Sequence, residues 1–95
     1  MARRITWAEP AWVDLESAAE YISRDSPHYA AAFVQEVRSA VESLSELGER
    51  GQMVPEFRDP TIRELLVRPY RVVYQILPDE LRIVAVIHGS RRLRR

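Results

Sequence analysis

The sequence predicts a small α+β domain, in which an antiparallel helical hairpin packs on one face of a mostly antiparallel sheet. Apolar residues recur at helical spacing through the first half of the chain, and β-prone runs separated by turn residues fill the second half. The 95 residues contain no cysteine, so a hydrophobic core rather than disulfides must hold the fold together. We expect residues 1–95 to form a single domain with the element order β-α-α-β-β-β.

The chain opens with a short β-prone segment, Ile5–Trp7, and then enters a helix. Pro10 suits the first turn of that helix because its missing N–H would have no partner there. Apolar residues then follow at spacings of three and four, which predicts an amphipathic helix to about Arg24. These apolar positions are Trp12, Leu15, Ala19 and Ile22.

A second helix is predicted after the break at residues 25–27. Ser26 is the expected N-cap, Pro27 the first helical residue and Gly48 the stop. The apolar stripe is Ala30, Phe33, Val37, Ala40, Leu44 and Leu47. Because so short a break joins two amphipathic helices, they should form an antiparallel hairpin, and the remaining apolar surface of each requires a sheet to cover it.

The second half of the chain predicts that sheet. Residues 49–60 are rich in turn formers and are expected to form a loop, followed by a short strand at 63–67. The β-rich runs 70–77 and 81–88 flank residues 78–80, which predicts a β-hairpin.

Alternation along the hairpin predicts two different faces. The apolar face, which the helices should cover, carries Tyr70, Val72, Tyr74, Ile76, Leu81, Ile83, Ala85 and Ile87. The opposite face carries Arg71, Val73, Gln75, Leu77, Arg82, Val84, Val86 and His88. A solvated sheet face would normally be more uniformly polar, so this mixture of arginine and valine predicts a surface that a partner covers.

The zero net charge of the chain hides an asymmetry that also points to a partner. Residues 1–57 hold five arginines and ten acidic residues, whereas residues 58–95 hold nine arginines and four acidic residues. Such a dipolar distribution influences association rather than folding. The longest apolar run is far shorter than the roughly 20 residues of a membrane-spanning helix, and the first residues do not resemble a signal peptide. We therefore expect a cytoplasmic protein without a membrane segment.

Several short motifs, spread over essentially the whole chain, resemble the ParE/RelE superfamily of bacterial type II toxins. The most distinctive combination is a Tyr-Arg-Val-Val-Tyr strand followed by a strand that ends in His-Gly-x-Arg. The matching segments in this chain are residues 5–7, 11–15, 20–22, 27–33, 44–48, 51–56, 62–65, 70–74 and 86–91.

The resemblance implies a growth-inhibiting toxin that a cognate antitoxin neutralises, as a heterotetramer or a larger complex. In this superfamily the C-terminal segment of the antitoxin wraps the toxin and covers both the helical hairpin and the sheet. The expected antitoxin-binding residues are Arg71, Val73, Arg82, Val84 and Val86.

Two branches of the superfamily imply different chemistry. ParE-like members inhibit DNA gyrase and lack nuclease activity, whereas RelE-like members are ribosome-dependent mRNA endoribonucleases. RNA cleavage requires an acid, a base and cationic stabilisation of the phosphorane. The chain has no lysine, His88 is the sole imidazole near the sheet, and arginine is a poor proton shuttle. We therefore favour a ParE-like toxin with no catalytic residues; the RelE-like alternative would use Arg71, His88 and Arg91.

The arginine-rich C-terminus is the candidate contact with the target. The predicted target-binding residues are Arg91, Arg92, Arg94 and Arg95. Structural roles remain open for all these groups: a solvated tail, an ion pair of Arg71 with Glu64 or Glu80, and a local hydrogen bond of His88. The two histidines are far apart and lack a nearby carboxylate motif, so neither a metal site nor a cofactor is expected.

Overall fold

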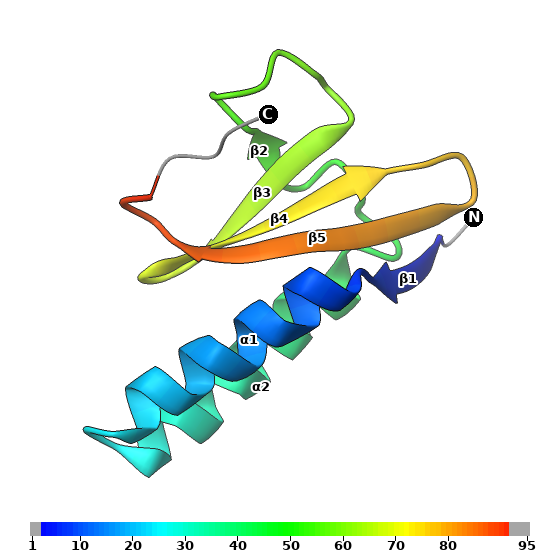
Figure 1. Cartoon of the computed structure of the whole chain (residues 1–95). Helices are drawn as coiled ribbons and strands as arrows, with labels where there is room; N and C mark the ends of the chain where they lie inside the picture. Colours follow the sequence, from blue (N-terminus) through cyan, green and yellow to red (C-terminus); the bar gives the residue numbers. More distant parts are fainter. Residues whose placement is uncertain (1–2, 92–95) are drawn as a thin grey trace.

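The computed structural model describes residues 3–91, which form a helical layer packed against a five-stranded sheet (Figure 1). The helices are α1 (Glu9–Ser23) and α2 (Pro27–Ser43). The strands are β1 (Arg4–Trp7), β2 (Gln52–Met53), β3 (Ile62–Val67), β4 (Tyr70–Ile76) and β5 (Glu80–His88). Their spatial order is β1-β5-β4-β3-β2, with only the β1–β5 pair parallel. The predicted α+β class and the helical hairpin on a mostly antiparallel sheet are confirmed.

The helical hairpin follows the predicted signals at its break but ends earlier than predicted. The side chain of Ser26 accepts a hydrogen bond from the Tyr29 amide at 3.1 Å, and Pro27 is the first residue of α2. The predicted helix to Leu47 is wrong, because α2 ends at Ser43 and the chain turns there. This turn leaves Leu44 fully buried and Leu47 largely exposed. None of the helices in residues 3–91 is long and apolar enough to span a membrane.

Strand β2 is the element that the sequence did not predict. It has two exposed residues, which pair with Glu64 and Arg63 of β3 at the edge of the sheet. Two residues are too few to show an alternating pattern, so only the pairing with β3 defines this strand.

The core lies between the helices and one face of the sheet, and Tyr74 is its largest fully buried side chain. The Tyr74 hydroxyl donates to the Gly48 carbonyl at 2.8 Å and accepts from the Gly51 amide at 2.9 Å. Burial raises the pKa of Tyr74 above its ordinary value, so the hydroxyl stays protonated and keeps both roles. Tyr74 thereby attaches the segment after α2 to the sheet.

A β-bulge in β5 reverses the predicted faces of its C-terminal part. Val73 pairs with Ala85 while the next residue, Tyr74, pairs with Ile83, which leaves Val84 as the extra residue. One extra residue turns every later side chain to the opposite face. The predicted faces are therefore wrong beyond Val84. Val86 belongs to the core on the helix side, together with Val72, its partner in β4.

The pairing of β1 with β5 supports a prediction about pH. The Thr6 hydroxyl donates to Glu80 Oε2 at 2.6 Å, and this hydrogen bond is the main reason why the pKa of Glu80 lies below its ordinary value. Thr6→Val should raise that pKa towards the ordinary value, whereas Thr6→Ser should leave it low, as carboxyl NMR titration would show. Because the folded pKa is the lower one, this stabilisation is present above the unfolded pKa of about 4.3 and is lost as the pH falls through the folded pKa. An unchanged Glu80 titration in Thr6→Val would contradict this role.

Candidate functional site

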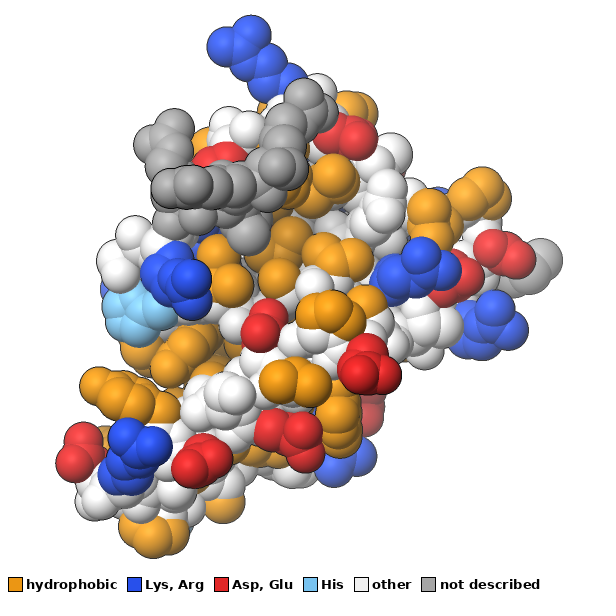
Figure 2. Space-filling model, viewed as in Figure 1, with side chains coloured by type: hydrophobic (Ala, Val, Ile, Leu, Met, Phe, Trp, Pro, Cys, Tyr) orange, Lys and Arg blue, Asp and Glu red, His pale blue; other side chains and the backbone are white. Residues whose placement is uncertain are grey.

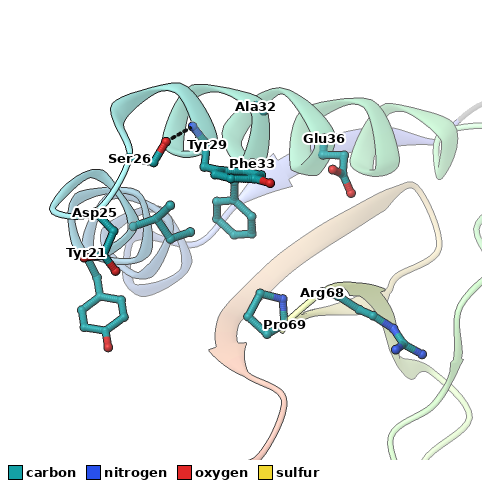
Figure 3. Close-up of a pocket in the computed structure, with 10 residues that line it drawn as sticks. Tyr21, Asp25, Ser26, Tyr29, Ala32, Phe33, Glu36, Arg68 and Pro69 are labelled. Atoms are coloured by element: carbon teal, nitrogen blue, oxygen red, sulfur yellow. Dashed lines mark hydrogen bonds between the residues drawn. The ribbon is translucent and has the colours of Figure 1, made fainter.

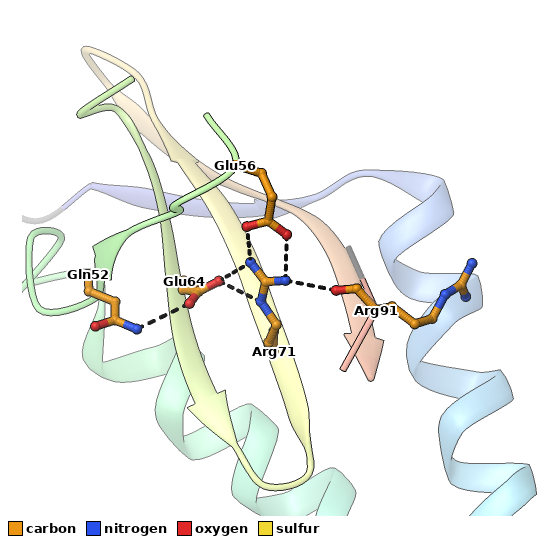
Figure 4. A network of polar contacts seen from close by, with 5 residues as sticks. All are labelled: Gln52, Glu56, Glu64, Arg71 and Arg91. Carbon is orange, nitrogen blue, oxygen red and sulfur yellow. Dashed lines mark hydrogen bonds and ion pairs between the residues drawn. The ribbon is translucent and has the colours of Figure 1, made fainter. Parts of the chain in front are cut away.

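Arg71 is the centre of a polar network on the sheet face opposite the helices (Figure 4). Its side chain comes from β4 and is only 7% exposed. Nε donates to Glu64 Oε1 at 2.7 Å, and the two Nη atoms donate to the two carboxylate oxygens of Glu56 at 2.8 Å each. Glu64 lies on the neighbouring strand β3, while Glu56 reaches the guanidinium from the loop between β2 and β3. The network therefore joins two strands and a loop.

Each of the three nitrogens of the Arg71 guanidinium donates at least one hydrogen bond. Besides the three bonds above, Nη1 donates to the Arg91 carbonyl at 3.0 Å, and Nη2 lies 2.6 Å from Glu64 Oε1. A guanidinium carries five N–H groups, so four of them donate hydrogen bonds here and Nη2 makes a further ion-pair contact. Gln52 Nε2 donates to the other Glu64 oxygen at 3.2 Å. The predicted structural alternative of an Arg71–Glu64 ion pair is confirmed, whereas Glu80 instead bonds Thr6 and Arg82.

The electrostatics of this network disfavour an incoming anion. The hydrogen bond with Glu56 raises the pKa of Arg71 above its ordinary value, so the guanidinium keeps its charge. The carboxylates of Glu56 and Glu64 are at most 10% exposed and both contact that one cation. A phosphate at this position would have to displace a carboxylate from a bidentate ion pair.

His88 lies on the other side of the sheet from Arg71. It pairs with Tyr70, and the two rings contact edge to face at a centroid distance of 5.6 Å. Its Nδ1 accepts from the Ser90 amide at 3.2 Å, which matches the local hydrogen bond left open as its structural role. Of the three residues predicted for the nuclease alternative, Arg71 thus hydrogen-bonds the backbone of Arg91, and His88 contacts Arg91 through its own backbone carbonyl, while its ring lies on the other side of the sheet from Arg71.

The predicted antitoxin-binding residues do not form one open surface. Arg71 and Val73 are buried in the chain itself, and Val86 is part of the helix-side core. Only Arg82, exposed on β5, and the partly buried Val84 at the bulge remain accessible. The prediction placed Val86 wrongly because of the bulge, and it missed the cover over Arg71 because Glu56 is remote in sequence.

Of the predicted target-binding arginines, Arg91 is exposed, and Arg92, Arg94 and Arg95 lie outside the described residues.

The structure shows a groove that the sequence did not predict, with a volume of about 450 Å³. It lies between the tip of the helical hairpin and the turn from β3 to β4 (Figure 3). Phe33 points from α2 towards the turn that carries Pro69. Tyr21 and Tyr29 line the groove although they are 65% and 70% exposed. Two tyrosines on either side of a helix break were the available sequence signal.

The outer surface of the helical layer combines acidic and apolar side chains (Figure 2). Trp12 and Val13 of α1 are about half exposed, and Glu16 and Glu20 are exposed on the same helix. Trp12 and Val13, together with Tyr21 and Tyr29 of the groove, give this layer an exposed apolar surface of the kind that partners cover. Within residues 3–91, no three His, Cys, Asp or Glu side chains are grouped so that they could hold a metal ion.

Comparison with known proteins identifies the family. A family model described as the ParE toxin of the type II toxin-antitoxin system parDE matches residues 5–93. The chain is 32% identical over 89 residues to Toxin RelE2 of Caulobacter vibrioides, covering 93% of this chain and 97% of that protein. It is also 32% identical over 92 residues to Putative toxin Y4kP of Sinorhizobium fredii, covering 95% of this chain and 92% of that protein.

A solved structure shares the fold. It is described as the chromosomal ParDE TA system from P. aeruginosa, and it superposes with a TM-score of 0.76 at 23% identity, covering 94% of this chain and 98% of that chain. The agreement extends over the helical hairpin and the sheet, and the family match extends over nearly the whole sequence. The chain therefore belongs to the ParE family of toxins of type II toxin-antitoxin systems.

Proposed function

We propose that this toxin acts as a ParE-like inhibitor of DNA gyrase and that a cognate antitoxin neutralises it. Membership of the ParE family supports a toxin. The observation that favours gyrase over RNA as the target is the state of Arg71, whose guanidinium is paired with Glu56 and Glu64 and bonded to the Arg91 carbonyl.

Ribonuclease chemistry would need a free cation beside the scissile phosphate and a proton-transfer pair within hydrogen-bond reach of it. Arg71 is committed to two carboxylates, and His88 is on the other face of the sheet. The chain also contains no lysine. The sheet thus lacks the convergent set of groups that the nuclease reaction requires, and a binding mechanism suits these residues better.

For the antitoxin, the favoured surface is the helical side of the molecule. The groove lined by Tyr21, Tyr29 and Phe33 and the exposed apolar side chains of α1 supply area that a wrapping segment would cover. Arg82 and Val84 extend the accessible surface onto β5. The superposable structure is described as a ParDE system, which supports an antitoxin partner, and we propose a heterotetramer or a larger complex.

The alternative is a RelE-like endoribonuclease. The name of the Caulobacter relative, Toxin RelE2, is the observation that favours it. In that case Arg71, His88 and Arg91 would carry the reaction, and the Arg71 network would have to open before a phosphate could bind.

A supercoiling assay with purified protein tests the proposal. We expect the parent protein to inhibit gyrase and to leave ribosome-bound mRNA intact, and we expect its antitoxin to restore supercoiling. Replacing Arg91, Arg92, Arg94 and Arg95 together by glutamine should weaken inhibition at least about tenfold, because a hydrogen bond to a charged group contributes about 1.5–3 kcal/mol.

Arg24→Gln is the matched control, since Arg24 is an exposed arginine on α1 and, among the described residues, forms an ion pair with Glu20 at 3.8 Å. Unchanged supercoiling together with cleavage of ribosome-bound mRNA would refute the gyrase proposal. If the variant with four glutamines inhibited gyrase as strongly as the parent protein, the role of these four arginines would be refuted, but the gyrase proposal would stand.

A further inference from the structure

We infer that Arg71 is a positioning residue for Arg91, because its guanidinium holds the Arg91 backbone where the chain leaves the sheet. The functional consequence rests on the proposed function, in which Arg91 contacts the target. The positional claim itself rests on the described contacts alone, and the two can be tested separately.

Arg91 is held at both of its peptide groups. Its amide donates to the His88 carbonyl at 2.9 Å, and its carbonyl accepts from Arg71 Nη1 at 3.0 Å. Just before it, the Gly89 amide donates to the Pro69 carbonyl at 2.7 Å. The chain therefore turns after β5 and is attached to the face that carries Arg71, while the Arg91 side chain extends away from the network (Figure 4).

The two carboxylates determine where the last donor of Arg71 points. Glu56 takes one N–H from each Nη atom, and Glu64 contacts Nε and Nη2. These bonds fix the plane of the guanidinium, and the remaining N–H on Nη1 is directed at the Arg91 carbonyl. This cluster is well suited to hold the Arg71 guanidinium in one orientation, because its charges are buried and bond to one another rather than to water.

A lysine could not replace Arg71 in this role. Its ammonium group would keep a positive charge between Glu56 and Glu64, but it is a compact charge on a flexible chain and lacks the planar fork. Arg71→Lys should therefore preserve the ion pairing in part and lose the contact with the Arg91 carbonyl. Fixing Arg91 in advance would lower the ordering cost of binding a target through its side chain.

The first experiment measures position without any target. In the folded protein we expect Arg71→Lys to lower the backbone {1H}-15N heteronuclear NOE of Arg91 markedly, while the amides of β4 and α2 keep their NOE values. Arg24→Lys, the same substitution at an exposed arginine, should leave the NOE of Arg91 unchanged. An Arg91 NOE that stays at its parent value in Arg71→Lys would overturn the inference. If that variant does not fold, Glu56→Gln, which leaves Arg71 paired with Glu64, is measured in its place with the same two outcomes.

The second experiment tests the functional consequence with a double-mutant cycle in the supercoiling assay. Arg71→Lys should weaken gyrase inhibition about five- to tenfold in the parent and less than twofold in the Arg91→Gln background, because its effect passes through Arg91. Equal weakening in both backgrounds would show a general structural role and overturn the positioning role in inhibition. If the parent protein does not inhibit gyrase, the proposed function fails, whereas the NOE of Arg91 still decides whether Arg71 positions Arg91.

Discussion

Replacing Arg71 by methionine is expected to lower the free energy of unfolding by about 3–5 kcal/mol, because it removes the cation that pairs directly with two buried carboxylates. Glu56 and Glu64 are at most 10% exposed, and both bond directly to Arg71. The loss would be measured by urea unfolding followed through the fluorescence of Trp7 and Trp12. A loss below about 1 kcal/mol would show that water or other groups compensate the carboxylates.

The control for this prediction removes the carboxylate charges together with the cation. In the triple variant Arg71→Met, Glu56→Gln and Glu64→Gln, we expect at least half of the lost stability to return, because both carboxylate charges are then removed together with the cation that paired with them. A triple variant as unstable as the single one would instead attribute the loss to packing around the methionine.

The second large effect is expected at Gly51, where the backbone is packed against the sheet. A Cβ atom at this position would lie 2.5 Å from the Glu64 carbonyl oxygen and 2.5 Å from the Tyr74 hydroxyl. Gly51→Ala must therefore move the segment away from β3 and break the bond of the Gly51 amide to Tyr74. We expect a loss of about 1–3 kcal/mol from overpacking and a further loss of about 1 kcal/mol from the hydrogen bond, measured by urea unfolding.

Gly48→Ala provides the matched comparison on the same segment. Its Cβ would lie 3.1 Å from Arg3 Nη1, the end of a flexible side chain that can move aside. We therefore expect Gly48→Ala to cost less than about 1 kcal/mol. Equal losses in the two variants would mean that the close approach at Gly51 is relieved by a small shift of the loop.

Much of the fold could be predicted from local pattern. Ser26 and Pro27 marked the start of α2, and the alternation from residue 70 onward marked the hairpin, because capping and periodicity act between near neighbours. The end of α2 was predicted too late, at Leu47. The apolar spacing continues through the turn that follows Ser43, so periodicity alone could not distinguish the turn from a helix.

The candidate site was predicted less well, for a reason visible in β5. Alternation assigns faces correctly only while each residue has one partner, and the extra residue Val84 is invisible until β4 and β5 are paired. The predicted partner surface consequently included Val86, which is buried against the helices, and placed His88 beside Arg71. The groove beside Phe33 was missed because it combines α2 with a turn far along the chain.

The sequence by itself determined the element order, the helical hairpin, the absence of lysine and the resemblance to the ParE/RelE toxins, because all of these are properties of composition and short-range pattern. Only the tertiary structure decided the state of Arg71. Whether a guanidinium is a free anion site or a neutralised anchor depends on which carboxylates the fold brings to it, and Glu56 lies 15 residues away along the chain. From the sequence alone, Arg71 could be a cation that binds phosphate in a nuclease. In the structure it is a buried cation paired with two carboxylates.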